Sequence, residues 1–113
     1  MKNIFLMLIL AMLPFWSCEN KTALPTPADQ CATISYSKNV APIISKHCCI
    51  RGCHASGSPP GDLTTYEGLH AQIENGFFQS KVFEQKSMPP TDALNEGELE
   101  TLKCWIQYGA LSN

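Results

Sequence analysis

The sequence predicts a small all-α domain of about three main helices. Apolar residues recur at helical spacing in three separate segments, and residues that favour helix ends flank these segments. No segment shows the alternation of apolar and polar residues that is typical of a β-strand. The part that can fold has about eighty residues, a length that predicts one domain.

The first predicted helix leads directly into a cysteine. Its positions at helical spacing are Val40, Ile43, Ile44 and His47. Asn39 can cap this helix, and Pro42 is tolerated in its first turn. The helix therefore delivers the chain into Cys48.

A second helix is predicted after a glycine- and proline-rich loop over residues 56–61. Thr64 or Thr65 can cap it, and it should end near Asn75 and Gly76. One face carries the apolar residues Tyr66, Leu69 and Ile73.

The third helix has the strongest terminal signals. Asn95 and Glu98 have the spacing of a capping box, and Gly109 provides a stop. The apolar stripe between them consists of Leu99, Leu102, Trp105 and Ile106. Acidic residues in its first turns lie where the helix dipole favours them.

The N-terminal residues are typical of an export signal that ends in a lipidated cysteine. Lys2 gives a positive start, residues 4–16 form an apolar run, and a serine followed by Cys18 ends it. The run is shorter than the ~20 apolar residues that span a bilayer. We expect lipoprotein signal peptidase to remove residues 1–17 and Cys18 to be acylated. The alternative is an ordinary signal peptide in which Cys18 is incidental.

A polar, proline-containing segment follows the predicted lipidation site. Such segments stay extended and solvated, so we assign residues 18–30 to the lipidated cysteine and a flexible tether. Residues 31–113 then form the folded domain. The expected location is a bacterial membrane surface, with the domain facing the periplasm or the cell exterior. A core of this size is marginal unless a cofactor or disulfide reinforces it.

Two cysteines with a histidine directly after the second indicate a cofactor site. Four residues separate Cys48 from Cys53, three separate Cys49 from Cys53, and His54 follows. Each thiol can add to a haem vinyl group as a thioether, which would bring His54 to the iron as proximal ligand. The usual attachment motif has two residues between its cysteines, so this loop is wider. The same cluster is also compatible with a zinc site or a disulfide framework.

A methionine later in the chain can complete the coordination of iron. Met88 precedes Pro89 and Pro90, which fix an extended segment. A methionine usually fills gaps in a core, but its thioether is also a soft iron ligand that raises the reduction potential. His70 is the alternative ligand. The other methionines lie in the predicted signal peptide: Met1, Met7 and Met12.

The order of these motifs resembles the small c-type cytochrome domains of bacterial lipoproteins and larger periplasmic proteins. The resemblance covers about residues 31–111 and is carried by five short stretches. They are Tyr-Ser-Lys-Asn-Val-Ala-Pro-Ile-Ile-Ser-Lys-His-Cys at 36–48, Gly-Cys-His at 52–54, Asp-Leu-Thr-Thr-Tyr-Glu-Gly at 62–68, Ser-Met-Pro-Pro at 87–90 and Leu-Lys-Cys-Trp-Ile-Gln-Tyr-Gly-Ala at 102–110.

This resemblance implies a cytochrome c-like fold in which about three main helices wrap around one covalent haem c. The haem would be held by Cys48 and Cys53, with His54 as proximal and Met88 as distal iron ligand. Some family members share the widened loop that ends in Gly-Cys-His, which favours Cys48 over Cys49.

Residues around these motifs have expected supporting roles. His47 should pack or form hydrogen bonds near the haem edge. Arg51 should either pair with a haem propionate or stay exposed. The expected pocket wall is aromatic: Phe77, Phe78 and Phe83.

If Cys18 carries lipid and Cys48 and Cys53 carry haem, three cysteines remain: Cys31, Cys49 and Cys104. An exported protein meets oxidising conditions, so we expect two of them to pair. Cys31 opens the domain and Cys104 lies in its last helix. A bridge between them would close a loop of more than seventy residues and stabilise the fold by ~4 kcal/mol on the chain-entropy model. Cys49 would stay single.

Charge and missing motifs exclude several functions. The net charge of −2 argues against a nucleic-acid partner. The chain lacks a glycine-rich phosphate loop and a paired histidine motif for metal on one helix. A six-coordinate iron has no open position for substrate, so we expect a non-enzymatic single-electron carrier that serves redox protein partners. One alternative is a haem-free lipoprotein that is stabilised by zinc or disulfides and acts as a binding module. The other is a haem sensor or peroxidase in which Met88 is absent from the iron or easily displaced.

Overall fold

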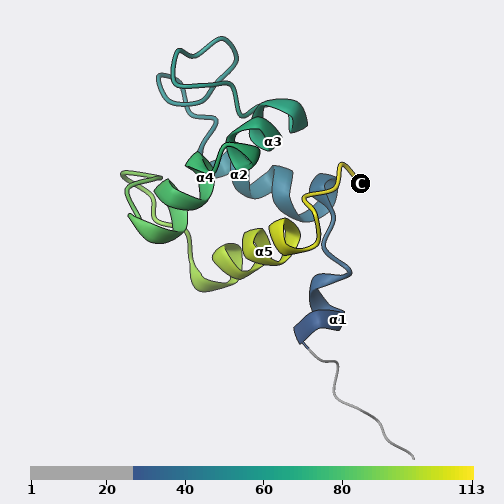
Figure 1. The fold of residues 1–113 in the computed structure, drawn as a ribbon. Helices are drawn as coiled ribbons and strands as arrows, with labels where there is room; N and C mark the ends of the chain where they lie inside the picture. The colour runs from purple at the N-terminus through teal and green to yellow at the C-terminus, as the bar shows by residue number, and fades with distance from the viewer. Residues whose placement is uncertain (1–26) are drawn as a thin grey trace, which may run out of the picture.

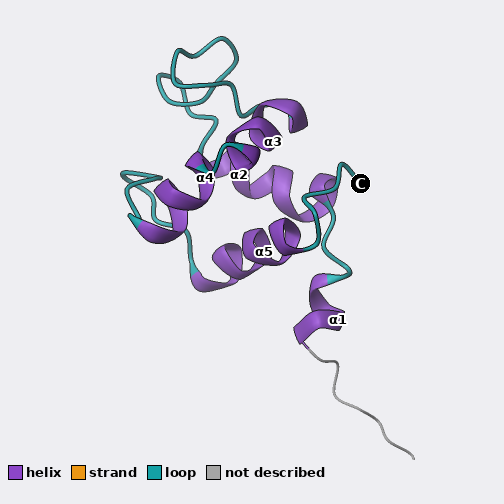
Figure 2. Ribbon diagram, viewed as in Figure 1, coloured by secondary structure: helices purple, strands orange, loops and turns teal. Residues whose placement is uncertain are grey.

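A computed structural model describes residues 27–113, and this part of the chain consists of helices and loops (Figures 1 and 2). The helices are α1 (Pro27–Cys31), α2 (Ala41–His47), α3 (Tyr66–Glu74), α4 (Phe77–Gln79) and α5 (Glu96–Gln107). Two π-helical turns accompany them, η1 (Tyr36–Val40) and η2 (Ser80–Glu84). No strand occurs among these residues, which confirms the all-α class. The three helices expected from the sequence correspond to α2, α3 and α5.

The predicted export signal, Cys18 and most of the predicted tether lie outside the described residues. The last four residues assigned to the tether, 27–30, are helical and form part of α1. Within residues 27–113, no helix has the length and apolar character needed to cross a membrane.

The helical segment that leads to Cys48 begins earlier than expected. Ser35 is extended, and its side chain accepts a hydrogen bond from the Lys38 amide, so Ser35 is the cap of η1. Asn39, the predicted cap, lies inside that turn and accepts a hydrogen bond from the Ser35 amide instead. Because η1 runs directly into α2, the chain is already helical at Asn39. Pro42 lies in the first turn of α2, as expected.

The capping signals of the other two main helices are confirmed. Thr65 rather than Thr64 caps α3, with its hydroxyl oxygen accepting from the Gly68 amide at 3.1 Å. Asn95 and Glu98 form the full capping box of α5, each side chain accepting from the other's amide. Gly109 follows α5 with a φ of 90°, a left-handed conformation that favours glycine.

The core lies where α2, α3 and α5 pack together with η1 (Figure 1). Its fully buried side chains are Val40, Ile44, Leu69, Leu102 and Trp105. Full burial of one such aliphatic side chain stabilises a fold by roughly 1.5–3 kcal/mol. Tyr36 and Tyr66 extend this core, with their ring centroids 5.2 Å apart and edge to face.

A disulfide joins α1 to α5. The structure pairs Cys31 with Cys104, whose Cα atoms are 4.8 Å apart across a sequence separation of 73. The Tyr108 hydroxyl also donates to the Ala28 carbonyl at 2.6 Å. Both contacts hold the N-terminal end of the described chain against the last helix.

The segment from Phe77 to Glu84 was not among the predicted helices. Gly76, with a φ of 79°, separates α3 from α4, and α4 continues directly into η2. Phe78 and Val82 from this segment are buried in the core. The chain then passes through a loop into α5, so Met88 lies between η2 and the last helix.

Candidate cofactor site

The structure brings four of the predicted site residues to one cavity of about 400 Å³. Cys48, Cys53, His54 and Met88 all line it, although Met88 is more than thirty positions away from the others in the sequence. Its volume lies within the roughly 300–1,000 Å³ that is typical of small-molecule and cofactor sites. The apolar wall includes Ile50, Leu63, Phe77, Phe78 and Val82.

The backbone around His54 orients its ring. The His54 amide donates to the Cys48 carbonyl at 3.2 Å, and the His54 carbonyl accepts from the Leu63 amide at 3.0 Å. The ring Nδ1 lies 3.0 Å from the carbonyl oxygen of Gly61. A carbonyl can only accept, so Nδ1 carries the proton and Nε2 keeps a lone pair. This arrangement is the one by which proteins orient a metal-binding histidine.

Cys48 lies at the end of α2, where its amide donates to the Ile44 carbonyl at 2.8 Å. Burial, together with the neighbouring Cys49 and Cys53 thiols, raises the pKa of the Cys48 thiol to about 11. Cys48 is therefore a neutral thiol near pH 7. Reactive catalytic cysteines have lowered pKa values, so the arrangement does not fit a thiolate nucleophile at this position.

Cys49 lies away from the cavity. It lines a separate small pocket of about 160 Å³ together with Tyr36, Ser45 and Thr64. Burial raises the pKa of its thiol, and the Asp62 carboxylate adds to that rise. Of the two cysteines that the sequence left as alternatives, the structure places Cys48, not Cys49, in one cavity with Cys53.

Met88 is not a filler of the hydrophobic core. Its exposed fraction is 42%, and it lies at the cavity together with Pro89 and Pro90. The amides of Ser87 and Met88 both donate to the Lys81 carbonyl, at 2.9 and 3.3 Å. A carbonyl of η2 thus fixes the chain on the N-terminal side of the methionine.

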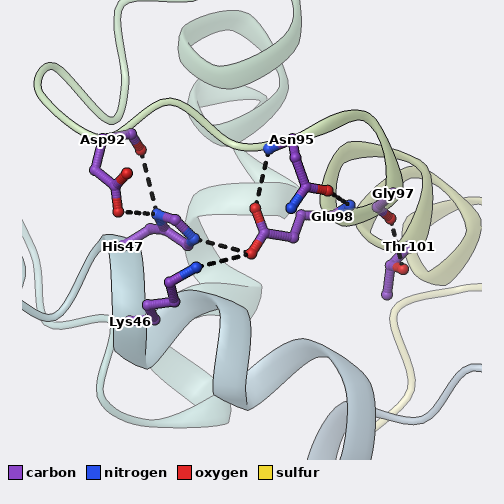
Figure 3. A network of polar contacts seen from close by, with 7 residues as sticks. All are labelled: Lys46, His47, Asp92, Asn95, Gly97, Glu98 and Thr101. Atoms are coloured by element: carbon purple, nitrogen blue, oxygen red, sulfur yellow. Dashed lines mark hydrogen bonds and ion pairs between the residues drawn. The ribbon is translucent and has the colours of Figure 1, made fainter.

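His47 is one of the polar residues that line the cavity. Figure 3 shows its polar contacts. Its ring is 3% exposed, and the two ring nitrogens face carboxylates from different parts of the chain. Nδ1 lies 2.8 Å from Asp92 Oδ2, and Nε2 lies 3.0 Å from Glu98 Oε1. The pKa of Glu98 is lowered to about 2, first by the Asn95 amide and then by His47 and Lys46. The expectation that His47 forms hydrogen bonds beside the pocket agrees with this network.

Three other residues named from the sequence do not line the cavity. Arg51 is exposed in the attachment loop. Phe83 packs edge to face on Phe78, with 5.9 Å between ring centroids, so it supports the wall from behind. His70, the alternative iron ligand, packs on the Tyr66 ring at 5.2 Å and lies 3.7 Å from Glu74.

The sequence did not reveal two residues that contribute to the site, Gly61 and Asp92. Gly61 offers its carbonyl to His54 and has a φ of 112°, which disfavours other residues. The Pro-Pro-Gly sequence at 59–61 could have flagged such a turn. Asp92 pairs with His47 across 45 positions of sequence, and no local pattern reports a contact of that range.

The described residues contain one cluster of possible metal-ligating atoms, and it lies away from the cavity. Over residues 27–113, the only group of three or more ligand atoms lying within 4.8 Å of one another belongs to Cys31, Glu100 and Cys104. Two of these sulfurs are joined to each other in the disulfide and cannot serve as thiolates. The cysteines and histidine of the attachment loop form no such group.

Comparisons with models of protein families, with curated proteins and with solved structures gave no match for this chain. The likeness to c-type cytochromes therefore stays a prediction from the motifs. The functional interpretation depends on the residues that the fold brings to the cavity.

Proposed function

We propose that this protein is a monohaem c-type cytochrome that carries single electrons. The observation that supports the proposal most is the composition of one cavity. It combines two thiols, a histidine with a free Nε2 and a methionine thioether, in the residues Cys48, Cys53, His54 and Met88. This donor set is the one that holds haem in cytochromes c.

Each residue has a defined part in the proposed site. The thiols of Cys48 and Cys53 would add across the two vinyl groups of haem, each sulfur bonding to one vinyl carbon while the thiol hydrogen goes to the other. His54 Nε2 and the Met88 sulfur would then bind the iron. Haem supplies an iron that changes its charge by one electron. The chain supplies its attachment, its two axial ligands and the apolar wall.

The axial pair favours electron transfer over bond-making catalysis. Histidine and methionine together close the coordination of iron and raise its reduction potential relative to harder ligands. The apolar wall works in the same direction, because a low-dielectric surrounding disfavours the extra charge of ferric iron. The proposed partners are redox proteins.

The proposed location is the outer face of a bacterial membrane, with a lipid on Cys18. Residues 18–26 would connect the anchor to α1, which the Cys31–Cys104 disulfide fastens to α5. An oxidising compartment suits this disulfide.

The test is whether the cysteines carry covalently bound haem in protein made with a cytochrome maturation system. Haem should remain on the chain after denaturation and extraction with acidified organic solvent, and the mass should rise by one haem. Cys48→Ser should lose one thioether, because its side chain reaches the cavity. Cys49→Ser, the matched control, should keep both thioethers because its side chain lies in the other pocket.

Two outcomes would contradict the proposal or change its site. A colourless chain of apo mass would leave the haem-free, disulfide-stabilised lipoprotein as the better interpretation. Loss of a thioether in the Cys49 variant alone would move the attachment to the narrower spacing.

A further inference from the structure

The segment that follows Met88 has few polar contacts of its own. In the described chain, residues 89–94 form no backbone–backbone hydrogen bonds with the rest of the protein. On the N-terminal side, Ser87 and Met88 are bound to the Lys81 carbonyl. On the C-terminal side, the Asn95 amide is bound to Glu98. The position of the segment between these two ends therefore depends on side chains.

His47 supplies the polar contacts to this segment. Its Nδ1 lies 3.2 Å from the Asp92 carbonyl oxygen and 2.8 Å from the Asp92 carboxylate. Its Nε2 lies 3.0 Å from Glu98, at the N-terminus of α5. This one buried ring joins three elements, which are α2, the segment of residues 89–94 and α5 (Figure 3).

The sequence position of His47 gives this contact its functional meaning. His47 directly precedes Cys48, and Asp92 lies four residues after Met88. One side chain therefore connects α2, which Cys48 directly follows, to the segment that directly follows Met88. A buried, fully paired polar side chain specifies one arrangement of the groups around it.

We propose that His47 is a positioning residue that holds Met88 at the iron. This inference rests on the proposed function, because it assumes a haem in the cavity. Without His47, the segment after Met88 loses its polar contacts to α2, and the methionine leaves the iron more readily. His47 itself binds no iron in this proposal.

The chain offers a matched control pair. His70 and Glu74 form a second histidine–carboxylate contact, 3.7 Å long, on α3. Neither residue lines the cavity. Variants of this pair remove the same chemical groups without changing any contact of residues 89–94.

The experiment compares His47→Gln with His70→Gln in the full-length haem-loaded protein, well below its melting temperature. Three readouts report the distal ligand: the methionine–iron absorption band of the ferric form, the reduction potential and the rate of carbon monoxide binding to the ferrous form. His47→Gln should weaken the band, lower the potential and bind carbon monoxide at least about tenfold faster than the parent. His70→Gln should match the parent. A His47→Gln protein with the band, potential and binding rate of the control would overturn the proposal, even if it melted at a lower temperature.

If His47→Gln does not fold, a second variant tests the proposal. Asp92→Ala removes the 2.8 Å contact from an exposed side chain, and Glu74→Ala is its control. Amide exchange at Met88 and Asn95, whose hydrogen-bonded amides flank the segment, should be faster in Asp92→Ala, together with faster carbon monoxide binding. Rates equal to those of Glu74→Ala would overturn the proposal.

The parent protein separates failure of this inference from failure of the proposed function. A parent without haem contradicts the function. Amide exchange at Met88 and Asn95 in the haem-free parent and in Asp92→Ala still measures whether His47 holds the segment, and equal rates there would overturn the positioning role.

Discussion

At the scale of single residues, spacing in the sequence indicated a candidate attachment loop but could not tell which of Cys48 and Cys49 lies at one cavity with Cys53. Their different placement follows from the helix that ends there. Successive residues of an α-helix point about 100° apart, so two adjacent cysteines at its end face different surroundings. One faces the cavity and the other faces the pocket beside Tyr36. The partner of His54 could not be read from the sequence either, because the Gly61 carbonyl is backbone and carries no residue-specific signal.

Met88→Ala should convert the proposed electron carrier into a haem that binds external ligands. A thioether stabilises ferrous over ferric iron, so its loss should lower the reduction potential and open a coordination position. Carbon monoxide should then bind the reduced variant readily and the parent poorly. Spectroscopic titration and potentiometry measure both effects.

The matched control for Met88→Ala is Leu111→Ala, which removes another exposed apolar side chain outside the cavity. It should behave as the parent. Equal carbon monoxide binding by Met88→Ala and the parent, with an unchanged potential, would show that Met88 is not the ligand. His70 would then be the next residue to test.

At the scale of elements, local capping signals predicted the helices that have them. The Asn95–Glu98 box and the Thr65 cap are local contacts, so the sequence carries them directly. The segment from Phe77 to Glu84 has a glycine, Gly76, at its N-cap position, and it is stabilised by burying Phe78 and Val82 against the rest of the core. Such tertiary packing has no local signal. The early start at Ser35 was missed because Asn39 offered an equally plausible cap.

Gly68 fixes the contact between α3 and the loop that carries His54. A Cβ at this position would overlap the Asp62 carbonyl oxygen, which is backbone and cannot swing aside. Asp62 follows Gly61, the partner of His54. Gly68→Ala should therefore destabilise the fold by about 1–3 kcal/mol, although alanine favours a helix over glycine by about 1 kcal/mol.

Gly97→Ala is the control for this prediction. Gly97 lies in the first turn of α5, and the nearest atom to its Cβ would be Asn95 Oδ1 at 3.4 Å. The substitution should leave stability unchanged or raise it by up to about 1 kcal/mol. Denaturant unfolding of both variants measures the difference. Equal free energies of unfolding would show that α3 can shift away from the loop at no cost.

At the scale of the whole molecule, the α2–α3 loop and α1 lie at opposite ends of the described domain (Figure 1). The loop carries Cys53 and His54, and α1 is the end from which a tether to Cys18 would extend. The sequence predicted both ends separately. Their relative placement depends on how α2, α3 and α5 cross, which periodicity alone does not specify.

Cys18→Ala should release the protein from membranes if the N-terminal motif is a lipidation site. Acyl chains supply the membrane affinity of a lipoprotein, at about 0.8 kcal/mol per buried CH₂. Cell fractionation measures the release, and inhibition of lipoprotein signal peptidase should accumulate the unprocessed precursor. A variant that stays with the membrane to the same extent as the parent would place the anchor elsewhere.

The disulfide should contribute stability without affecting the spectrum of the proposed haem. Cys31 and Cys104 close a loop with a sequence separation of 73, and on the chain-entropy model their bridge is worth about 4 kcal/mol. Neither residue lines the cavity. The double variant Cys31→Ser/Cys104→Ser should therefore unfold at a lower denaturant concentration but keep the axial ligands of the parent.

Cys49→Ser, which removes a thiol that forms no disulfide, is the control. A double variant as stable as this control would show that the bridge adds nothing to the fold, and a changed methionine–iron band would show that α1 influences the distant cavity.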